Sequence, residues 1–140
     1  MLPAGRRPAG GCWREGHPVA GALDSLEGYG AAEHVQILRR GLHSFEVDEA
    51  ALAAGARRPV RVVVNGFAAA IALCRDTDLI ATVPGRHTEG LRRGVRTFAL
   101  PFQIAGFTIS MLWHPRMDGD LAHRWLRSCL RSACAAGKTG

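Results

Sequence analysis

Residues 60–84 read VRVVVNGFAAAIALCRDTDLIATVP, and this segment decides the fold class. Its two ends, 60–64 and 78–83, are short apolar runs rich in β-branched side chains, which is typical of buried strands. The apolar residues 67–75 between them are long enough to form a helix that packs against a sheet. A strand, a helix and a second strand in this order predict an α/β fold with a mainly parallel sheet.

The same alternation of strands and helices continues on both sides of this segment. Upstream, the pattern predicts a capped helical turn at 24–29, a strand at 34–39 and a helix at 47–54 that ends at Gly55. Downstream, it predicts a helical turn at 88–93, strands at 95–100 and 107–113, and a helix at 118–133.

The helix predicted at 118–133 is amphipathic. Its apolar face is formed by Leu121, Ala122, Trp125, Leu126, Cys129, Leu130 and Ala133. Three arginines, Arg124, Arg127 and Arg131, share the other face, where the pattern predicts solvated side chains or contact with an acidic partner.

Composition bounds the class of protein. The chain has 140 residues, 47% of them hydrophobic and 21% charged, which fits one globular domain and excludes a disordered chain. The longest apolar run, 67–74, is far shorter than the roughly 20 residues that span a bilayer, so no membrane protein is predicted. The net charge is +6, and the excess lies in residues 71–140. Because no run exceeds two adjacent basic residues, solvated arginines are favoured over an anionic partner.

The chain ends and the cysteines add little chemistry. Residues 1–11 and 135–140 are predicted to be a disordered lead-in and tail. No apolar segment of an export signal accompanies Arg6-Arg7 or Cys12, so a cytoplasmic protein is expected. The four cysteines show no CxxC spacing and the six histidines no HxxxH spacing, so neither a disulfide, a metal site nor a cofactor is predicted.

No catalytic motif is present, but three junctions between strands and loops are suggestive. GxGxxG, GxxxxGK[ST] and GxSxG are all absent, which favours a protein that is not an enzyme. Residues 39–43, 65–67 and 82–84 each place polar or aromatic groups before a predicted helix or helical turn, where backbone N–H groups bind anions. These junctions are either ordinary loops or the lining of a cleft for a small carboxylate or aromatic ligand.

Three long segments carry a family resemblance. HVQILRRG at 34–41, the segment from Val47 to Arg86 that ends in TDLIATVPGR, and LPFQIAGFTISMLWHPRMDGDLAHRWLRSCL at 100–130 resemble the effector-binding domain of LysR-type transcriptional regulators. REGHPVAG at 14–21 resembles another segment of that domain. The resemblance covers about residues 12–131 and is closest to the branch of bacterial nodulation-type and aromatic-compound regulators.

The resemblance implies a periplasmic-binding-protein-like (type 2) fold of two α/β subdomains with the effector held between them. It implies that residues 12–83 form the effector-binding subdomain II and residues 84–134 the C-terminal part of subdomain I, with 82–84 crossing between them. The family's winged helix-turn-helix and the first part of subdomain I have no counterpart in the sequence. We therefore expect a truncated regulator or a wrongly assigned start, with apolar surface exposed on the incomplete subdomain.

The resemblance also implies the effector-binding residues. The matching positions are His43, Phe45, Asn65, Phe67 and Thr82. His43 would donate a hydrogen bond to an acidic effector and Phe67 would stack on an aromatic one. Each of the five is equally consistent with a structural role, and residues 44–49 depart from the family's pattern in the first loop.

The function predicted from this resemblance is a small-molecule sensor without catalytic residues. Its expected partners are a small aromatic or acidic effector and other copies of the chain or an intact regulator. DNA would be contacted only through the helix-turn-helix domain that the sequence lacks. The alternative is a non-sensing remnant that only oligomerises with an intact paralogous regulator.

Overall fold

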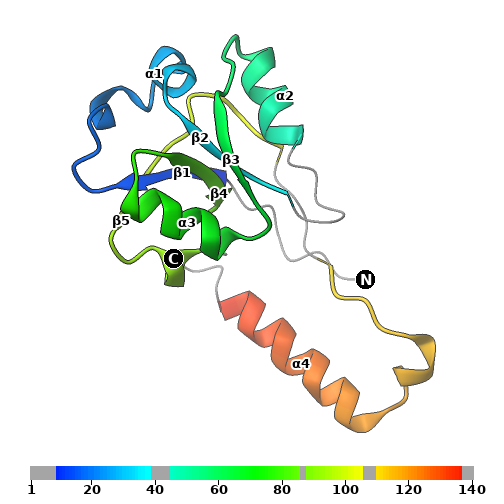
Figure 1. The fold of residues 1–140 in the computed structure, drawn as a ribbon. Helices are drawn as coiled ribbons and strands as arrows, with labels where there is room; N and C mark the ends of the chain where they lie inside the picture. Colours follow the sequence, from blue (N-terminus) through cyan, green and yellow to red (C-terminus); the bar gives the residue numbers. More distant parts are fainter. Residues whose placement is uncertain (1–8, 39–44, 86–87, 106–109, 137–140) are drawn as a thin grey trace. The chain divides into compact units, whose positions relative to one another are not determined.

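The computed structural model describes residues 9–38, 45–85, 88–105 and 110–136 (Figure 1). The chain divides into two compact units. The larger unit comprises residues 7–106, and the smaller one comprises residues 107–140 with residues 1–6. Because the two units are not placed relative to one another, each is described by itself.

The larger unit is built on one five-stranded sheet with the strand order β3-β2-β4-β1-β5. The strands are β1 (Ala9–Arg14), β2 (His34–Ile37), β3 (Val60–Val64), β4 (Ile80–Pro84) and β5 (Val95–Phe98). Strand β2 pairs in parallel with β3 and β4, whereas β1 runs antiparallel to both β4 and β5. The α/β class is confirmed, but the sheet is mixed rather than mainly parallel, because β1 enters it in the opposite direction.

Helices cover both faces of this sheet (Figure 1). They are α1 (Leu26–Ala31), α2 (Phe45–Ala53) and α3 (Phe67–Asp76), with short 3-10 turns at η1 (Ala20–Ala22) and η2 (Glu89–Leu91). Helix α3 packs on one face, where its buried residues meet an apolar cluster that includes Ala81 and Val83 of β4. A second cluster on the other face joins Tyr29 of α1 and Ala51 of α2 to Ile80 of β4. Successive residues of β4 therefore face opposite cores, as the two-residue period of a strand requires.

The larger unit continues past Val83 and includes β5. The predicted boundary after Val83 falls inside this sheet, because β5 follows it and pairs with β1. Residues 82–84 thus lie in a central strand of this sheet. The two units divide after residue 106.

Strand β1 begins at Ala9, inside the segment 1–11 that was predicted to be a disordered lead-in. Gly11 explains why the pattern conceals it. A Cβ atom built on Gly11 would lie 2.0 Å from the ring of Phe98 on β5, so only glycine leaves room for that ring. Gly11, one of the glycines that make this segment look disordered, is therefore explained by a close approach within the sheet.

The smaller unit consists of the 3-10 turn η3 (Pro115–Met117) and helix α4 (Leu121–Ala136). Of the strand predicted at 107–113, residues 107–109 lie outside the described residues, and residues 110–113 contain a single bridged residue. Among the described helices of both units, none is long and apolar enough to cross a membrane.

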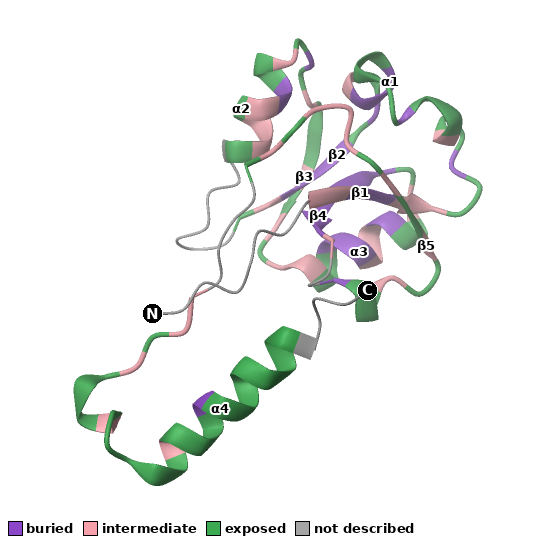
Figure 2. Cartoon of the chain, turned by 180° about the vertical axis from the view of Figure 1, so that it is seen from behind, coloured by how far each residue is buried: buried purple, intermediate pink, exposed green. Residues whose placement is uncertain are grey.

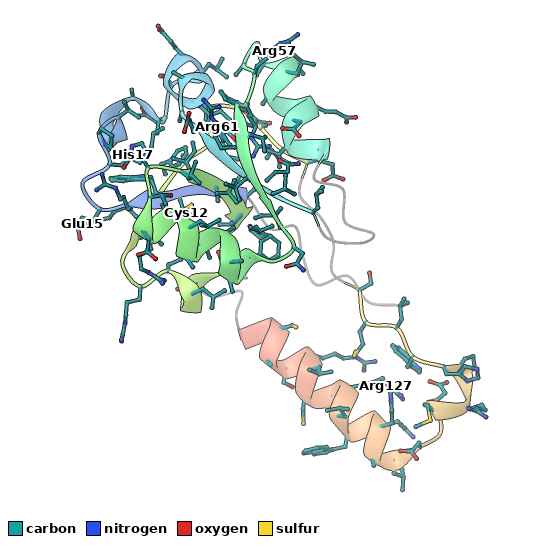
Figure 3. The ribbon with its side chains drawn as sticks, in the orientation of Figure 1. Cys12, Glu15, His17, Arg57, Arg61 and Arg127 are labelled. Atoms are coloured by element: carbon teal, nitrogen blue, oxygen red, sulfur yellow. The ribbon has the colours of Figure 1, made fainter. Side chains whose placement is uncertain are left out.

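Helix α4 is held by the face that was predicted to be solvated. The Arg127 side chain is only 6% exposed and donates to the carbonyl oxygens of Met117, at 3.0 Å, and Asp118, at 3.2 Å. Its guanidinium carbon lies 4.6 Å from the ring centre of Trp113 (Figure 3). The prediction of a solvated side chain is therefore wrong for Arg127, because three partners from the preceding segment surround it.

The apolar face of α4 is exposed (Figure 2). Leu121 is 79% exposed and Trp125 is 69% exposed, and Leu126 and Leu130 are each 47% exposed. This agrees with the apolar surface expected on this part of the chain.

Candidate functional site

The carboxyl ends of the parallel strands define one edge of the sheet. Ile37 at the end of β2 is in register with Val64 at the end of β3, and β4 runs parallel to both and ends at Pro84. Loops after parallel strands meet at such an edge, which is where ligands bind in open α/β sheets. Of the three junctions singled out in the sequence, residues 65–67 follow β3 and residues 82–84 end β4 at this edge, whereas residues 39–43 lie outside the described residues.

Two of the predicted effector residues lie together at this edge. Asn65 follows β3 and is exposed, and Phe67 is the first residue of α3. The Phe67 side chain is half-buried and packs against the apolar cluster beneath α3. Asn65 is therefore available to a ligand, whereas Phe67 contributes to the core.

Thr82 lies apart from these two residues. It is buried in β4, and its hydroxyl group lies 2.8 Å from the hydroxyl group of Tyr29 on α1. Because Ala81 and Val83 face the α3 side, Thr82 faces the side covered by α1 and α2. The sheet thus separates Thr82 from Phe67.

The side chains of the two remaining predicted residues, His43 and Phe45, are not described. His43 lies outside the described residues. Phe45 begins α2, and its side chain is not described.

A polar network reaches Thr82 through Tyr29 on the same face of the sheet. Arg58 is its centre, with a side chain that is only 3% exposed. Its Nη1 group donates to Asp48 Oδ1 on α2 at 2.6 Å and to Gln36 Oε1 on β2 at 3.0 Å. Gln36 in turn donates from Nε2 to Asp48 Oδ2 at 3.3 Å. This network anchors the first turns of α2 to the sheet.

His34 extends this network to Tyr29. Its Nε2 lies 2.8 Å from the backbone carbonyl of Tyr29, so Nε2 carries the proton and donates. Its Nδ1 accepts from Arg58 Nε at 3.4 Å. Burial, and then the charge of Arg58, lower the pKa of His34 to about 4, which keeps the ring neutral. With both nitrogens engaged, His34 holds its neighbours in place and has no free position for acid–base catalysis.

No sequence pattern predicted this network as a whole, although one signal was available. His34 and Gln36 occupy alternate positions of the strand HVQI, so one face of this strand is polar while Val35 and Ile37 face the apolar core. Two polar residues at strand spacing in a buried strand indicate polar partners on that face. Arg58, which lies in a loop 22 residues further along, carried no such signal.

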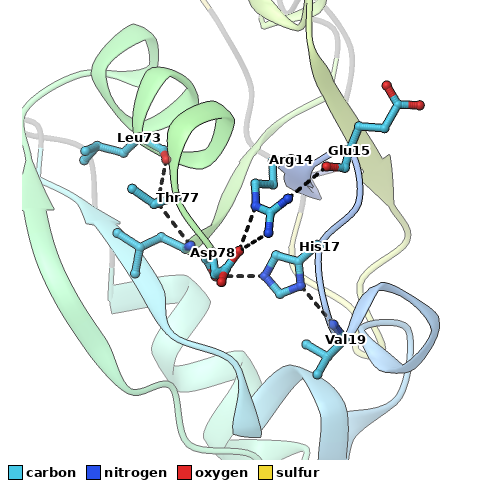
Figure 4. Close-up of polar contacts among 8 residues, drawn as sticks. Arg14, Glu15, His17, Val19, Leu73, Thr77 and Asp78 are labelled. Atoms are coloured by element: carbon cyan, nitrogen blue, oxygen red, sulfur yellow. Dashed lines mark hydrogen bonds and ion pairs between the residues drawn. The ribbon is translucent and has the colours of Figure 1, made fainter.

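The opposite edge of the sheet has a polar cluster of its own (Figure 4). Arg14 Nε donates to Asp78 Oδ1 at 2.7 Å, and His17 Nε2 donates to the backbone carbonyl of Asp78 at 2.8 Å. His17 Nδ1 accepts from the backbone N–H of Val19 at 3.2 Å. These contacts fix the turn after β1 to the segment before β4, and they occupy both ring nitrogens of His17.

These features define an α/β domain in which the described polar groups hold helices and turns to the sheet. The family model for the LysR substrate binding domain matches residues 2–135, so the chain belongs to this family. The chain is 32% identical over 127 residues to the HTH-type transcriptional regulator LinR of Sphingobium indicum, covering 88% of this chain and 42% of that regulator. It is 34% identical over 119 residues to the HTH-type transcriptional activator NahR of Pseudomonas putida, covering 84% of this chain and 40% of the activator.

A solved structure agrees with this assignment. The regulatory domain of MexT, a transcriptional activator in Pseudomonas aeruginosa, superposes with a TM-score of 0.78 and 33% sequence identity. The match covers 92% of this chain and 64% of that structure. The chain thus spans about two-fifths of the length of the curated regulators that it matches. These relatives are transcriptional regulators, and the periplasmic-binding-protein-like fold expected from the resemblance is confirmed.

Proposed function

We propose that this chain is a small-molecule sensor and that its effector binds at the carboxyl edge of β2, β3 and β4. The observation that carries the proposal is the alignment of these strand ends, which brings exposed Asn65 and the first residues of α3 to one edge. Backbone N–H groups at the start of α3 favour an acceptor or anionic group on the ligand. The effector is therefore a small acidic or aromatic molecule.

Effector binding would act by changing how copies of the chain are arranged in an oligomer. A ligand with different affinities for two arrangements of a homo-oligomer, or of a mixed oligomer with an intact regulator, shifts the balance between those arrangements. DNA contact would come from a helix-turn-helix domain supplied outside these 140 residues. We place the protein in the cytoplasm and assign it no enzymatic activity.

A thermal-shift assay of the purified chain tests the sensor proposal. Aromatic and aliphatic acids, with benzoate and succinate as the first probes, are expected to raise the melting temperature of the larger unit. Ligand at 100 times its dissociation constant stabilises by about 2.7 kcal/mol. Asn65→Ala should abolish the shift with succinate, whereas Gln103→Ala, which removes another exposed amide, should not. A flat response across the panel would refute the proposal.

The second candidate is the non-sensing remnant that only oligomerises with an intact paralogous regulator. It is favoured by the exposed apolar face of α4, where Leu121 and Trp125 are more than two-thirds exposed. Exposed apolar patches of this kind mark protein interfaces. The candidate predicts that the chain co-purifies with such a regulator without added ligand and that Trp125→Ser weakens the association. Co-purification that is indifferent to Trp125→Ser would argue against this surface.

A further inference from the structure

An aromatic cluster lies on the sheet face that α1 and α2 share, over β1 and β5. It consists of Trp13, Tyr29, Phe98 and Phe102. The ring centre of Tyr29 lies 6.3 Å from that of Phe98 and 5.1 Å from that of Phe102. Tyr29 is fully buried, whereas the other three side chains are half-buried and pack against the same apolar core. Tyr29 therefore lies at the buried side of the cluster, and the other three side chains are partly exposed to solvent.

The backbone of β1 is shaped for this cluster. The ring of Phe98 lies against Gly11, where a Cβ atom would approach it to 2.0 Å. Gly11 is the position opposite Phe98 in the β1–β5 pairing, and Trp13 follows it on the same face. The missing side chain leaves room for the Phe98 ring over Gly11.

Trp13 brings an unused hydrogen-bond donor into this cluster. Its indole Nε1 is buried and has no hydrogen-bond partner, and it is the only such side-chain atom within the described part of the chain. Burying an N–H group without an acceptor costs free energy, and most proteins avoid it. A buried N–H in this state is a position that an external acceptor would stabilise.

The neighbouring polar groups already have partners. Both ring nitrogens of His17, whose ring centre lies 6.2 Å from that of Trp13, are bonded to the backbone. The hydroxyl groups of Tyr29 and Thr82 are bonded to each other. None of these side chains is thus available as an acceptor for Trp13 Nε1, and an acceptor on a bound molecule would find this donor unused.

The charge beside Trp13 suggests which acceptor would be favoured. Arg96 is the residue directly opposite Trp13 in the β1–β5 pairing, so the two side chains lie on the same face. Arg96 is exposed and bonded to the carboxylate of Glu15. A guanidinium group at the margin of an aromatic cluster favours a carboxylate over a cation, while the rings favour a flat apolar body.

We propose that this aromatic cluster is a second small-molecule site, which takes a planar molecule bearing a carboxylate or carbonyl oxygen. The rings of Phe98 and Phe102 contact the body of the molecule, and its oxygen accepts the hydrogen bond from Trp13 Nε1. The site is independent of the effector site proposed at the carboxyl edge and includes neither Asn65 nor Phe67.

Three probes of similar shape test this site. Benzoate and benzamide have an oxygen acceptor, whereas toluene has none. In a ¹H–¹⁵N spectrum of the intact chain, benzoate and benzamide at millimolar concentration are expected to move the Trp13 indole N–H resonance downfield, and toluene is not. Trp13→Phe and Trp113→Phe identify the resonance. The absence of a saturable shift with either benzoate or benzamide would overturn the proposal.

Affinities give the second measurement, by ligand-observed titration. Trp13→Phe keeps an aromatic ring but loses the donor, so it should weaken benzamide about tenfold, weaken benzoate at least as much and leave toluene unchanged. Trp113→Phe, in the other unit, is the matched control and should change none of them. Equal benzoate affinity in the wild type and in Trp13→Phe would overturn the proposal. So would a comparable loss of benzamide affinity in Asn65→Ala, which reports on the carboxyl edge alone.

Discussion

The bond between Tyr29 and Thr82 provides the sharpest test of how this sheet is held together. Both side chains are buried, with exposed fractions of 0% and 9%, and their hydroxyl oxygens are 2.8 Å apart. Thr82→Val keeps the shape of the side chain but leaves the Tyr29 hydroxyl group without this partner. Removing one partner of a buried hydrogen bond costs about 1–3 kcal/mol. We therefore expect Thr82→Val to lower the unfolding free energy of the larger unit by about 1.5 kcal/mol.

A double-mutant cycle separates this bond from packing effects. Tyr29→Phe should cost a similar amount, while the double variant should cost less than the sum by about 1 kcal/mol, because the second substitution removes a group that is already unpaired. Urea unfolding would be followed by Trp13 emission in a Trp113→Phe/Trp125→Phe background, so that only the larger unit reports. Each single variant should shift the midpoint at an unchanged slope. Additive effects in this cycle would refute a direct bond between the two hydroxyl groups.

Three further outcomes follow from the polar groups. The pKa of His34 is lowered to about 4 in the folded chain and is near 6.5 in the unfolded chain. The contribution of His34 to the unfolding free energy is therefore constant above pH 6.5 and falls by up to about 3 kcal/mol as the pH drops toward 4. Urea midpoints across this pH range measure this loss, and His34→Gln should remove it. Asp48→Asn leaves Arg58 buried without its counter-ion and should lower the unfolding free energy by about 2 kcal/mol. This loss is smaller than is usual for a buried ion pair because the Asp48 side chain is 40% exposed. A urea midpoint that the substitution leaves unchanged would contradict the network. Arg127→Ala should loosen the segment before α4, seen as faster amide exchange at Met117 and Asp118, whereas Arg124→Ala, on an exposed arginine of the same helix, should not.

The order of elements could be read from the sequence because it depends on local patterns. The β-branched run at 60–64 is β3 with the predicted bounds, and the apolar segment that follows is α3, one residue longer than predicted. Gly55 was predicted to end the preceding helix, and its φ of 95° is a conformation that glycine adopts readily. These features rest on neighbours in the chain, so no knowledge of the fold was needed.

The features that were missed depend on partners far away in the sequence. Strand β1 is concealed by glycines, of which Gly11 is explained only by Phe98, 87 positions further along. The sequence pattern around Arg58 does not indicate that its side chain is buried, because its ion-pair partner Asp48 lies ten residues away on α2. Arg127 looked solvated because its partners include backbone carbonyl groups, which leave no trace in a pattern of side chains. Long-range packing and main-chain acceptors thus limit what sequence patterns can predict.

The two faces of the sheet restrict how the predicted effector residues can act. Phe67 packs into the apolar core under α3, and Thr82 faces the other side, so no single small molecule at the edge touches both without crossing the sheet. Asn65 is exposed at the edge and is reached directly. Thr82 would influence a ligand only through Tyr29, which also lies at the buried side of the aromatic cluster. A ligand that depends on Thr82 should therefore depend on Tyr29 as well, whereas one that depends on Asn65 should tolerate Tyr29→Phe.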